Sequence, residues 1–506
     1  MVTMMFSATP FETVLREDAY VYLLKGFEIT EGNWVPPLGH SVGWSAILAF
    51  FLKLFGIQSL YGGMVLSRIL SILAIGFSIF PFSGLVNKLV DKKSAVIAVL
   101  GFALSPALIV TVSSKFAGYS EPAFILFVIL TIYFLADSAD SPLNLVIATI
   151  LASLSYWLRP NGIFMLGVVL LYSTYLVWCR KINWAFLLLI PFLFFLVSLP
   201  HLYTRYEAYG SAFDFGKNSQ YFVDSHARVT TSITPAPYVS IFNYLSTHSI
   251  SDYYHKFLVN GLFRIASQFY SMLGTVWSLL FLLGCLNYLA INRFSKFYVI
   301  FVLFFVFVAG FTPVFEAYGI QRHLFVLAPF AFIISSKLLI DLTGASKRNN
   351  LLVLSFILFL LLYAPLKTII RGINITTPRV QDEWAIWAED NLQGKIVIVE
   401  GNDLVEMNLI NKKIGSTNLR NLSVEQLGID AFRPNSYNSL EDAMQDFKKM
   451  GVSYLMLDRE NIKRRSYLYE VYKSEWSRNF ILIQSFRSKP KDKWIIKDMD
   501  IFKIVY

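Results

Sequence analysis

Long apolar runs separated by short polar connections occupy most of the chain. A helix needs about 20 apolar residues to cross about 30 Å of hydrocarbon, and closely spaced runs of that kind recur between residues 64 and 369. We therefore predict an all-α polytopic membrane domain over residues 64–371. The predicted spans are residues 64–86, 94–113, 118–136, 143–158, 162–179, 184–203, 267–291, 297–315, 323–341 and 351–369.

Two regions flank the predicted membrane domain. Residues 1–63 form an external first loop, whose apolar stretch 43–57 is short and contains Lys53, a pattern typical of a helix lying at the interface. Residues 377–506 are charged and mixed, with strand-like runs KIVIVEG, VSYLMLD, NFILIQSF and MDIFKIVY and a helical pattern at 439–450. They predict a C-terminal α/β domain, and because it contains no Gly-rich phosphate loop, a lid or a recognition domain is favoured over a catalytic one.

The orientation follows from the cations in the short connections, because cytoplasmic loops are enriched in Lys and Arg. With these loops inside, the first loop, residues 204–266 and everything after residue 370 lie outside the cell membrane. We predict a multi-pass protein of the plasma (inner) membrane with an extracytoplasmic C-terminal domain. Since no signal precedes the external N-terminus, we also expect a further helix ahead of this sequence. The loop cations are Lys88, Lys92, Lys93, Arg180, Lys181, Arg293, Lys296, Lys347 and Arg348.

Composition supports the membrane assignment and excludes other classes. Of the 506 residues, 55% are hydrophobic and 15% charged, which is more apolar side chain than a soluble globule buries. The net charge is +10, but the cations lie mostly between apolar runs, so nucleic acid is not an expected partner. The only cysteines, Cys179 and Cys285, lie within or beside apolar runs, which argues against a disulfide framework and a zinc site.

Three acidic residues on the predicted external side are candidates for chemistry, because ionisable groups near the membrane are costly. In PFETVLREDAYVYLLKG, helical spacing places Asp18 on the apolar stripe of Val14 and Tyr22, while Glu17 points elsewhere. Glu121 in SSKFAGYSEPAF opens the next span. A structural role is an equal alternative for each site, since acids cap helices and favour helix N-termini.

Several cations lie at the same predicted border, where the bias toward internal cations does not place them. Arg322 and His323 in AYGIQRHLFVLAP, Arg159 in YWLRPNG and Lys115 in the loop before Glu121 are candidates to bind a lipid phosphate. We interpret Arg205 and Arg264 as anchors at the headgroup level, and His201 as a polar loop residue. No metal site is predicted.

External carboxylates together with external cations suit group transfer from a lipid phosphate. A carboxylate accepts the proton of an acceptor hydroxyl, and cations offset the charge that gathers on the departing phosphate. Asp18 and Glu121 would need a third ligand to form a convincing divalent-cation site.

The order of several short motifs resembles the GT-C membrane glycosyltransferases. These motifs are REDAYVYL, PPLGH, an amphipathic helix ending in KLFG, and LSRILSIL. PPLG is similar to a motif of the protein O-mannosyltransferases and aminoarabinose transferases. FAGYSEP resembles the second acidic loop of oligosaccharyltransferase catalytic subunits, and RHLFVLAP resembles a late Arg-aromatic-Pro pattern of the class. The likeness covers about residues 10–340 in scattered pieces.

The resemblance implies roles for the acidic residues. Asp18, with Glu17 as the alternative, takes the position of the first-loop carboxylate that acts as base or positions the acceptor, and Glu121 takes the second-loop position. The sequence departs from the family in lacking the usual first helix and any WWD motif, and in having valine before PPL where the mannosyltransferases have histidine. The missing WWD argues against protein N-glycosylation.

We therefore expect an inverting glycosyltransferase, a hexosyl or pentosyl transferase. It would move a sugar from a polyprenyl-phosphate donor to an extracytoplasmic acceptor hydroxyl on a protein, glycan or lipid. A divalent cation is an optional cofactor, membrane lipid is a partner, and nucleic acid is not. The alternatives are a transporter or flippase for a lipid-linked sugar, and a polysaccharide polymerase or ligase.

Overall fold

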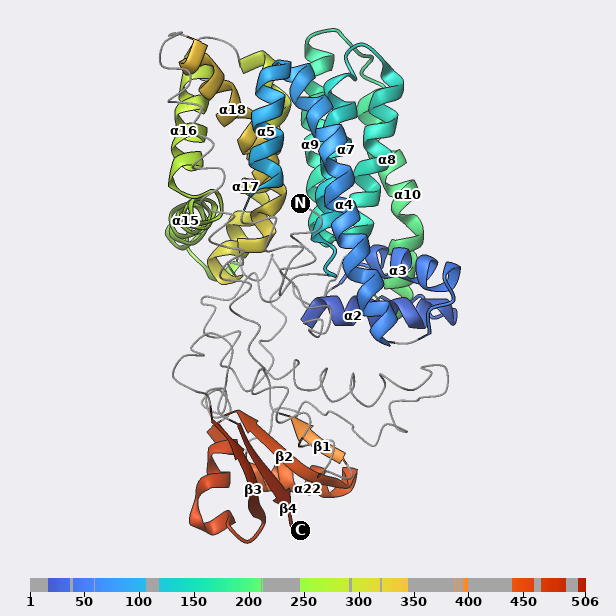
Figure 1. Ribbon diagram of the computed structural model, residues 1–506, viewed down its shortest axis with the longest axis vertical. Helices are drawn as coiled ribbons and strands as arrows, with labels where there is room; N and C mark the ends of the chain where they lie inside the picture. The colour runs from blue at the N-terminus through green and yellow to red at the C-terminus, as the bar shows by residue number, and fades with distance from the viewer. Residues whose placement is uncertain are drawn as a thin grey trace.

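The protein consists of a helical bundle and a small sheet at one end of it (Figure 1). The helices α2 and α3 lie across the end of the bundle that faces the sheet. The computed structural model describes residues 17–36, 40–58, 60–105, 118–210, 212, 246–290, 294–318, 321–344, 387, 391, 395–398, 439–458, 466–487 and 499–506.

The first half of the bundle follows the predicted apolar runs. Each described run is helical, and most helix ends lie within a few residues of the predicted ones. Pro160–Gly162 forms a short 3-10 turn, η1, before α9. The helices are α2 (Glu17–Thr30), α3 (Gly43–Leu54), α4 (Leu60–Leu89), α5 (Lys92–Ala103), α7 (Glu121–Ala136), α8 (Pro142–Leu158), α9 (Ile163–Trp178) and α10 (Phe186–Tyr209).

The second half differs from prediction at one span. Residues 267–291 do not form one straight helix, because the chain turns by 120° at Gly274, where φ is +77°. The helical segment before the turn begins at Ile250, inside the stretch 204–266 that we predicted as a loop. The elements are α14 (Ile250–Tyr253), the π-helix η2 (Tyr254–Gly261), α15 (Leu262–Leu273), α16 (Thr275–Ala290), α17 (Phe294–Tyr318), the 3-10 helix η3 (Gln321–Leu327) and α18 (Ala328–Gly344).

Some of the described helices are long enough to cross a membrane and others are shorter. Four helices are long and apolar enough to span a bilayer, and the bent pair adds a fifth if it is counted as one span. Four further apolar helices, α3, α7, α8 and the central part of α17, are shorter. The predicted span at 351–369 lies outside the described residues, as does the end of the one at 94–113.

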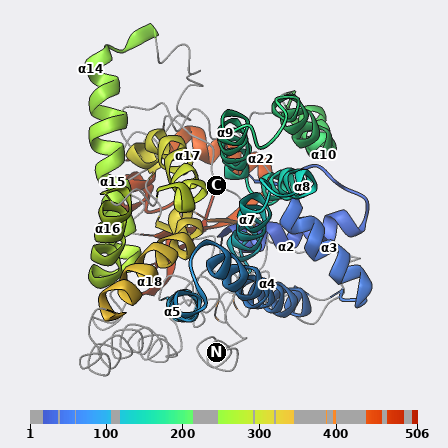
Figure 2. The ribbon, with the colours of Figure 1, turned by 90° about the horizontal axis from the view of Figure 1, so that it is seen from above.

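Apolar side chains cover both the inside and the outside of the bundle. The core packs α4, α7, α8 and α9 together, with Phe82, Val128 and Met165 fully buried among them. On the outside, Phe80 of α4 and Phe192 of α10 are largely exposed in the isolated chain, as expected of side chains that face lipid. Viewed along the bundle, α14 and α15 form one side of the molecule and lie across the direction of the spans (Figure 2).

Two predictions for polar residues in α10 are wrong. His201 is not in a loop but lies inside α10, fully buried, with its ring 5.5 Å from that of Tyr156 and 5.8 Å from that of Trp157. Arg205 does not extend to the headgroups, because its side chain is 0% exposed. Arg264, in contrast, lies on the exposed face of α15.

The end of the bundle away from α2 carries ion pairs between neighbouring helices. Lys88 at the end of α4 lies 2.5 Å from Asp137, which follows α7, and over the ring of Tyr133. Lys337 of α18 contacts Asp341 at 2.6 Å and Asp91 at 3.5 Å. These contacts fix the helix ends that join the Lys-rich connections.

The C-terminal sheet confirms the predicted strands and helix. Its order is β1-β2-β4-β3, with β1 parallel to β2 and the other neighbours antiparallel. The helix α22 supplies Phe447 to a core shared with Leu455 and Phe502. The elements are β1 (Lys395–Ile398), α22 (Leu440–Met450), β2 (Val452–Asp458), β3 (Phe480–Phe486) and β4 (Met499–Ile504).

Candidate active site

The start of α7 is held by two earlier helices, α3 and α4. Gly118 has φ of +93°, a turn conformation that favours glycine, and its carbonyl accepts hydrogen bonds from Trp44 Nε1 at 2.8 Å and Ser67 Oγ at 3.2 Å. Ser120 is the N-cap residue and Glu121 the first residue of the helix. Glu121 therefore lies where the helix dipole stabilises a carboxylate.

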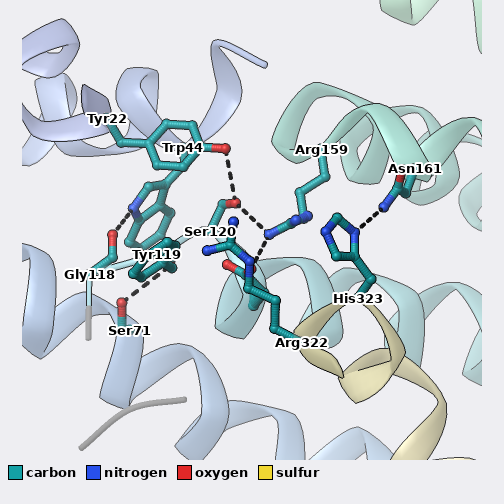
Figure 3. Close-up of polar contacts among 11 residues, drawn as sticks. Tyr22, Trp44, Ser71, Gly118, Tyr119, Ser120, Arg159, Asn161, Arg322 and His323 are labelled. Carbon is teal, nitrogen blue, oxygen red and sulfur yellow. Dashed lines mark hydrogen bonds and ion pairs between the residues drawn. The ribbon is translucent and has the colours of Figure 1, made fainter. Parts of the chain in front are cut away.

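Glu121 is buried between two guanidinium groups (Figure 3). Its Oε1 lies 2.5 Å from Arg159 Nη1 and 3.6 Å from Arg322 Nε, and the exposed fractions of the three side chains are 4%, 9% and 11%. Within the described part of the chain neither carboxylate oxygen has an aligned hydrogen bond, so the contacts are ion pairs whose geometry is not optimal. The cluster combines two cations with one anion.

The two arginines come from different parts of the chain. Arg159 follows α8, in extended backbone just before η1, and Arg322 lies in η3, with its guanidinium 4.8 Å from the centre of the Tyr119 ring. The aromatic face and the carboxylate together orient Arg322. The next residue, His323, approaches Asn161 of η1, with Nδ1 3.0 Å from Asn161 Nδ2 (Figure 3).

Ser120 connects this cluster to the first-loop helix. Its hydroxyl accepts a hydrogen bond from Arg159 Nη1 at 3.4 Å and donates one to the Tyr22 hydroxyl at 3.4 Å. Tyr22 belongs to α2, whose first two residues are Glu17 and Asp18. The backbone of Asp18 thus lies one helical turn before a residue that contacts the second acidic loop.

The structure brings together four residues that the sequence singled out, namely Glu121, Arg159, Arg322 and His323. Glu17 and Asp18 lie at the beginning of α2, where their side chains are outside the description, and Lys115 falls outside the described residues altogether.

Sequence reasoning missed four contacting residues. Asn161 sits in the same RPNG motif as Arg159, and Tyr119 and Ser120 precede Glu121 directly, so proximity to a candidate was their only signal. Tyr22 was noted only as a member of the apolar stripe.

No protein-family model matches the sequence, and no curated protein matches it. Solved structures do. The chain is similar to ArnT from Cupriavidus metallidurans bound to undecaprenyl phosphate, with a TM-score of 0.58 and 11% identity over 100% of this chain and 96% of that one. The absence of sequence matches agrees with so low an identity.

A second similarity is to the archaeal oligosaccharyltransferase AglB from Archaeoglobus fulgidus. Its complex with an inhibitory peptide and a dolichol-phosphate matches with a TM-score of 0.58 and 13% identity, over 97% of this chain and 72% of that one. Another structure of the Archaeoglobus fulgidus oligosaccharyltransferase, in complex with Zn and sulfate, has a TM-score of 0.55 and 14% identity.

The zinc complex raises the question whether the cluster around Glu121 fits a divalent cation. Among the described residues no group of three His, Cys, Asp or Glu side chains converges. The Glu121 carboxylate instead meets two guanidinium groups, which would repel a divalent cation. The described donor set therefore does not fit such an ion.

The likeness extends over the whole chain, from the first-loop helices through the bundle to the C-terminal sheet. At 11–14% identity it establishes the fold. The motif order that resembled the GT-C class is therefore matched by the arrangement in space. The chain is a multi-pass integral membrane protein with the GT-C fold, the fold of the membrane glycosyltransferases ArnT and AglB.

Proposed function

We propose that this protein is an inverting glycosyltransferase that moves a sugar from a polyprenyl-phosphate donor to an acceptor hydroxyl on the external side of the membrane. The observation that carries the proposal is the buried Arg159 and Arg322 pair, held by one carboxylate beside the first-loop helix. ArnT and AglB have been solved with undecaprenyl phosphate and dolichol-phosphate respectively, which supports the donor class.

The reaction needs a base on one side of the sugar and cations on the other. Asp18, with Glu17 as the alternative, takes the proton of the acceptor hydroxyl, whose oxygen attacks the anomeric carbon from the face opposite the phosphate. The bond between that carbon and the phosphate oxygen breaks, and its electron pair leaves with the phosphate. Because attack and departure occur on opposite faces, the anomeric configuration inverts.

Arg159 and Arg322 bind the phosphate and offset its growing charge as the sugar leaves. A guanidinium presents several donors in a fixed plane, which matches two phosphate oxygens. Among the described residues of the cluster, two cations face one carboxylate, and an anionic lipid can neutralise the remaining positive charge.

His323 adds a neutral donor to the cluster in this proposal. Asn161 Nδ2 is a donor, so the facing Nδ1 of His323 accepts and the neutral ring carries its proton on Nε2. That proton serves as a hydrogen-bond donor to a phosphate oxygen. Lys115 supplies a further cation.

The external location of the reaction is part of the proposal. The site and the C-terminal sheet lie at the same end of the bundle (Figure 1). The ion pairs of the Lys-rich connections lie at the other end, where the preference for internal cations places the cytoplasm. We assign the membrane to the plasma (inner) membrane.

One observation favours the rival function of a transporter or flippase for a lipid-linked sugar. The pair α15 and α16 is bent by 120°, and discontinuous helices are common at transporter binding sites. The charged cluster, however, includes the first residue of α7 and is joined through Ser120 to α2, which lies across the end of the bundle (Figure 1). Transporters bind their substrates at mid-depth instead. The enzyme is therefore the favoured function.

One assay decides between the two. Purified full-length protein in nanodiscs is incubated with undecaprenyl-phosphate sugars labelled in the sugar, together with a cell-envelope acceptor fraction, and the label that leaves the lipid is measured. An enzyme releases label in the wild type, and its activity falls in Arg322→Ala by about 10-fold to 160-fold if one charge-assisted contact of about 1.5–3 kcal/mol is removed. Label that stays on the lipid but crosses the bilayer of proteoliposomes would refute the enzymatic function and support the transporter.

A further inference from the structure

Arg205 is a cation at membrane depth that the proposed chemistry does not use. It lies in α10, its side chain is 0% exposed, and its Nη1 donates a hydrogen bond to the backbone carbonyl of His40 at 3.1 Å. Burying a guanidinium costs several kcal/mol unless its donors are satisfied, and the bond to His40 offsets part of that cost. Its described acceptor belongs to the segment between the first-loop helices α2 and α3.

That segment is clamped between α8 and α10. Ser41 Oγ donates to the carbonyl of Tyr156 at 3.3 Å. Gly43 packs so closely that a Cβ built there would lie 2.5 Å from the carbonyl oxygen of Trp157. Hydrogen bonds to two helices and a glycine contact fix the path of the chain at residues 40–43.

The clamp reaches the candidate site through aromatic and hydroxyl contacts. The ring of His40 meets the ring of Tyr22 edge to face, with centroids 5.2 Å apart at 79°. Tyr22 then accepts a hydrogen bond from Ser120, whose hydroxyl also contacts Arg159 (Figure 3). A continuous set of contacts therefore joins Arg205 to the helix that begins with Glu17 and Asp18.

We propose that Arg205 is a positioning residue: through His40 and Tyr22 it holds α2, the helix that begins with Glu17 and Asp18, against Ser120 at the start of α7. The expected effect of Arg205 on turnover rests on the proposed function. Its expected effect on the position of α2 is independent of that function. Arg suits the role because its planar group donates in fixed directions, which a flexible ammonium does not reproduce fully.

The test uses the purified full-length protein in nanodiscs and three variants. Arg205→Gln removes the charge and shortens the reach, Arg205→Lys keeps the charge, and Arg264→Gln is the matched control, an exposed arginine on α15 outside the contacts described above. Hydrogen exchange of the α2 amides, binding of undecaprenyl phosphate and turnover are measured for each.

We expect Arg205→Gln to speed exchange in α2 by at least 10-fold and to lower kcat by at least 10-fold, with affinity for undecaprenyl phosphate within about threefold of wild type. A purely structural role would lower the unfolding temperature, kcat and the affinity for undecaprenyl phosphate together. It would not lower kcat while leaving the affinity unchanged. Arg205→Lys should show smaller changes in α2 exchange and in kcat than Arg205→Gln, and Arg264→Gln should match wild type in both.

If Arg205→Gln does not fold, His40→Ala provides the second variant. It keeps the backbone carbonyl that Arg205 binds and removes only the ring that contacts Tyr22. The same faster exchange in α2 and lower kcat are expected. Exchange in α2 and kcat both within twofold of wild type, in whichever variant folds, would overturn the proposal. Faster exchange in α2 without sugar transfer by the wild type would support the positioning and refute the proposed function.

Discussion

Replacing Glu121 by Gln tests the arrangement of the site most directly, because it removes one charge from between two guanidinium groups at nearly constant size. At an effective dielectric constant of about 20, Coulomb's law gives about 7 kcal/mol for the 2.5 Å contact with Arg159 and about 5 kcal/mol for the 3.6 Å contact with Arg322. Desolvation offsets much of both. The difference indicates that Glu121 is paired more strongly with Arg159 than with Arg322.

In Glu121→Gln both cations lose this compensating charge, and the donor phosphate becomes its replacement. We expect affinity for undecaprenyl phosphate to increase at least 10-fold, which corresponds to about 1.4 kcal/mol and uses only part of the attraction released. Turnover should fall at least 10-fold, because the lipid phosphate leaves more slowly and the guanidinium groups lose their fixed orientation.

The assay is binding of undecaprenyl phosphate to the full-length protein in nanodiscs, with thermal unfolding measured in parallel. Breaking a buried ion pair costs about 3–5 kcal/mol, so Glu121→Gln should unfold at a lower temperature, and the lipid phosphate should restore more of that loss than it adds to the wild type. Glu207→Gln is the control, since Glu207 is an exposed acid of α10 that pairs with the Tyr203 hydroxyl.

Unchanged affinity in a folded Glu121→Gln protein would refute the reasoning, because the carboxylate would then not be the charge that competes with phosphate. Affinity weakened by 10-fold or more would refute it in another way. The carboxylate would then contribute more to donor binding by orienting the two guanidinium groups than it costs by competing with the phosphate.

Three further predictions concern the base, the topology and the packing. Asp18→Asn should retain folding and donor binding while turnover falls about 100-fold to 10,000-fold, the usual contribution of a general base, and near wild-type turnover would transfer the role to another acid. In a cysteine-free background, Glu31→Cys and Lys473→Cys, both exposed, should each react with an impermeant thiol reagent on intact cells, and labelling of only one would contradict the common external side. Gly43→Ala should lower the free energy of unfolding by about 1–3 kcal/mol because its Cβ meets a backbone carbonyl of α8, whereas Gly76→Ala, with open space around it, should not destabilise the protein.

The motifs that carried the resemblance to the GT-C class differ in how far the structure explains them. FAGYSEP and RHLFVLAP supply Glu121 and Arg322, which meet directly. PPLGH contributes the backbone and ring of His40 to the clamp below α2. REDAYVYL opens α2, and its Tyr22 contacts the site through Ser120. These four motifs are thus joined through contacts that their separation along the chain conceals.

The sequence alone determined the membrane class, most of the helices and the strands of the C-terminal sheet. These properties are local, because about 20 apolar residues in a row specify a spanning helix and alternating residues specify a strand. The break at Gly274 escaped prediction because the run 267–291 is mostly apolar on both sides of it, and a direction change depends on packing as much as on one glycine.

Only the tertiary structure decided which polar residues act together. Arg205 and Arg264 give the same sequence signal, a cation at the end of an apolar run, yet one is fully buried and the other exposed. Burial depends on which helices pack on each side, and local hydropathy does not contain that information. The same reason applies to Glu121, Arg159 and Arg322, which lie on three separate elements and meet because the bundle folds their ends to one place.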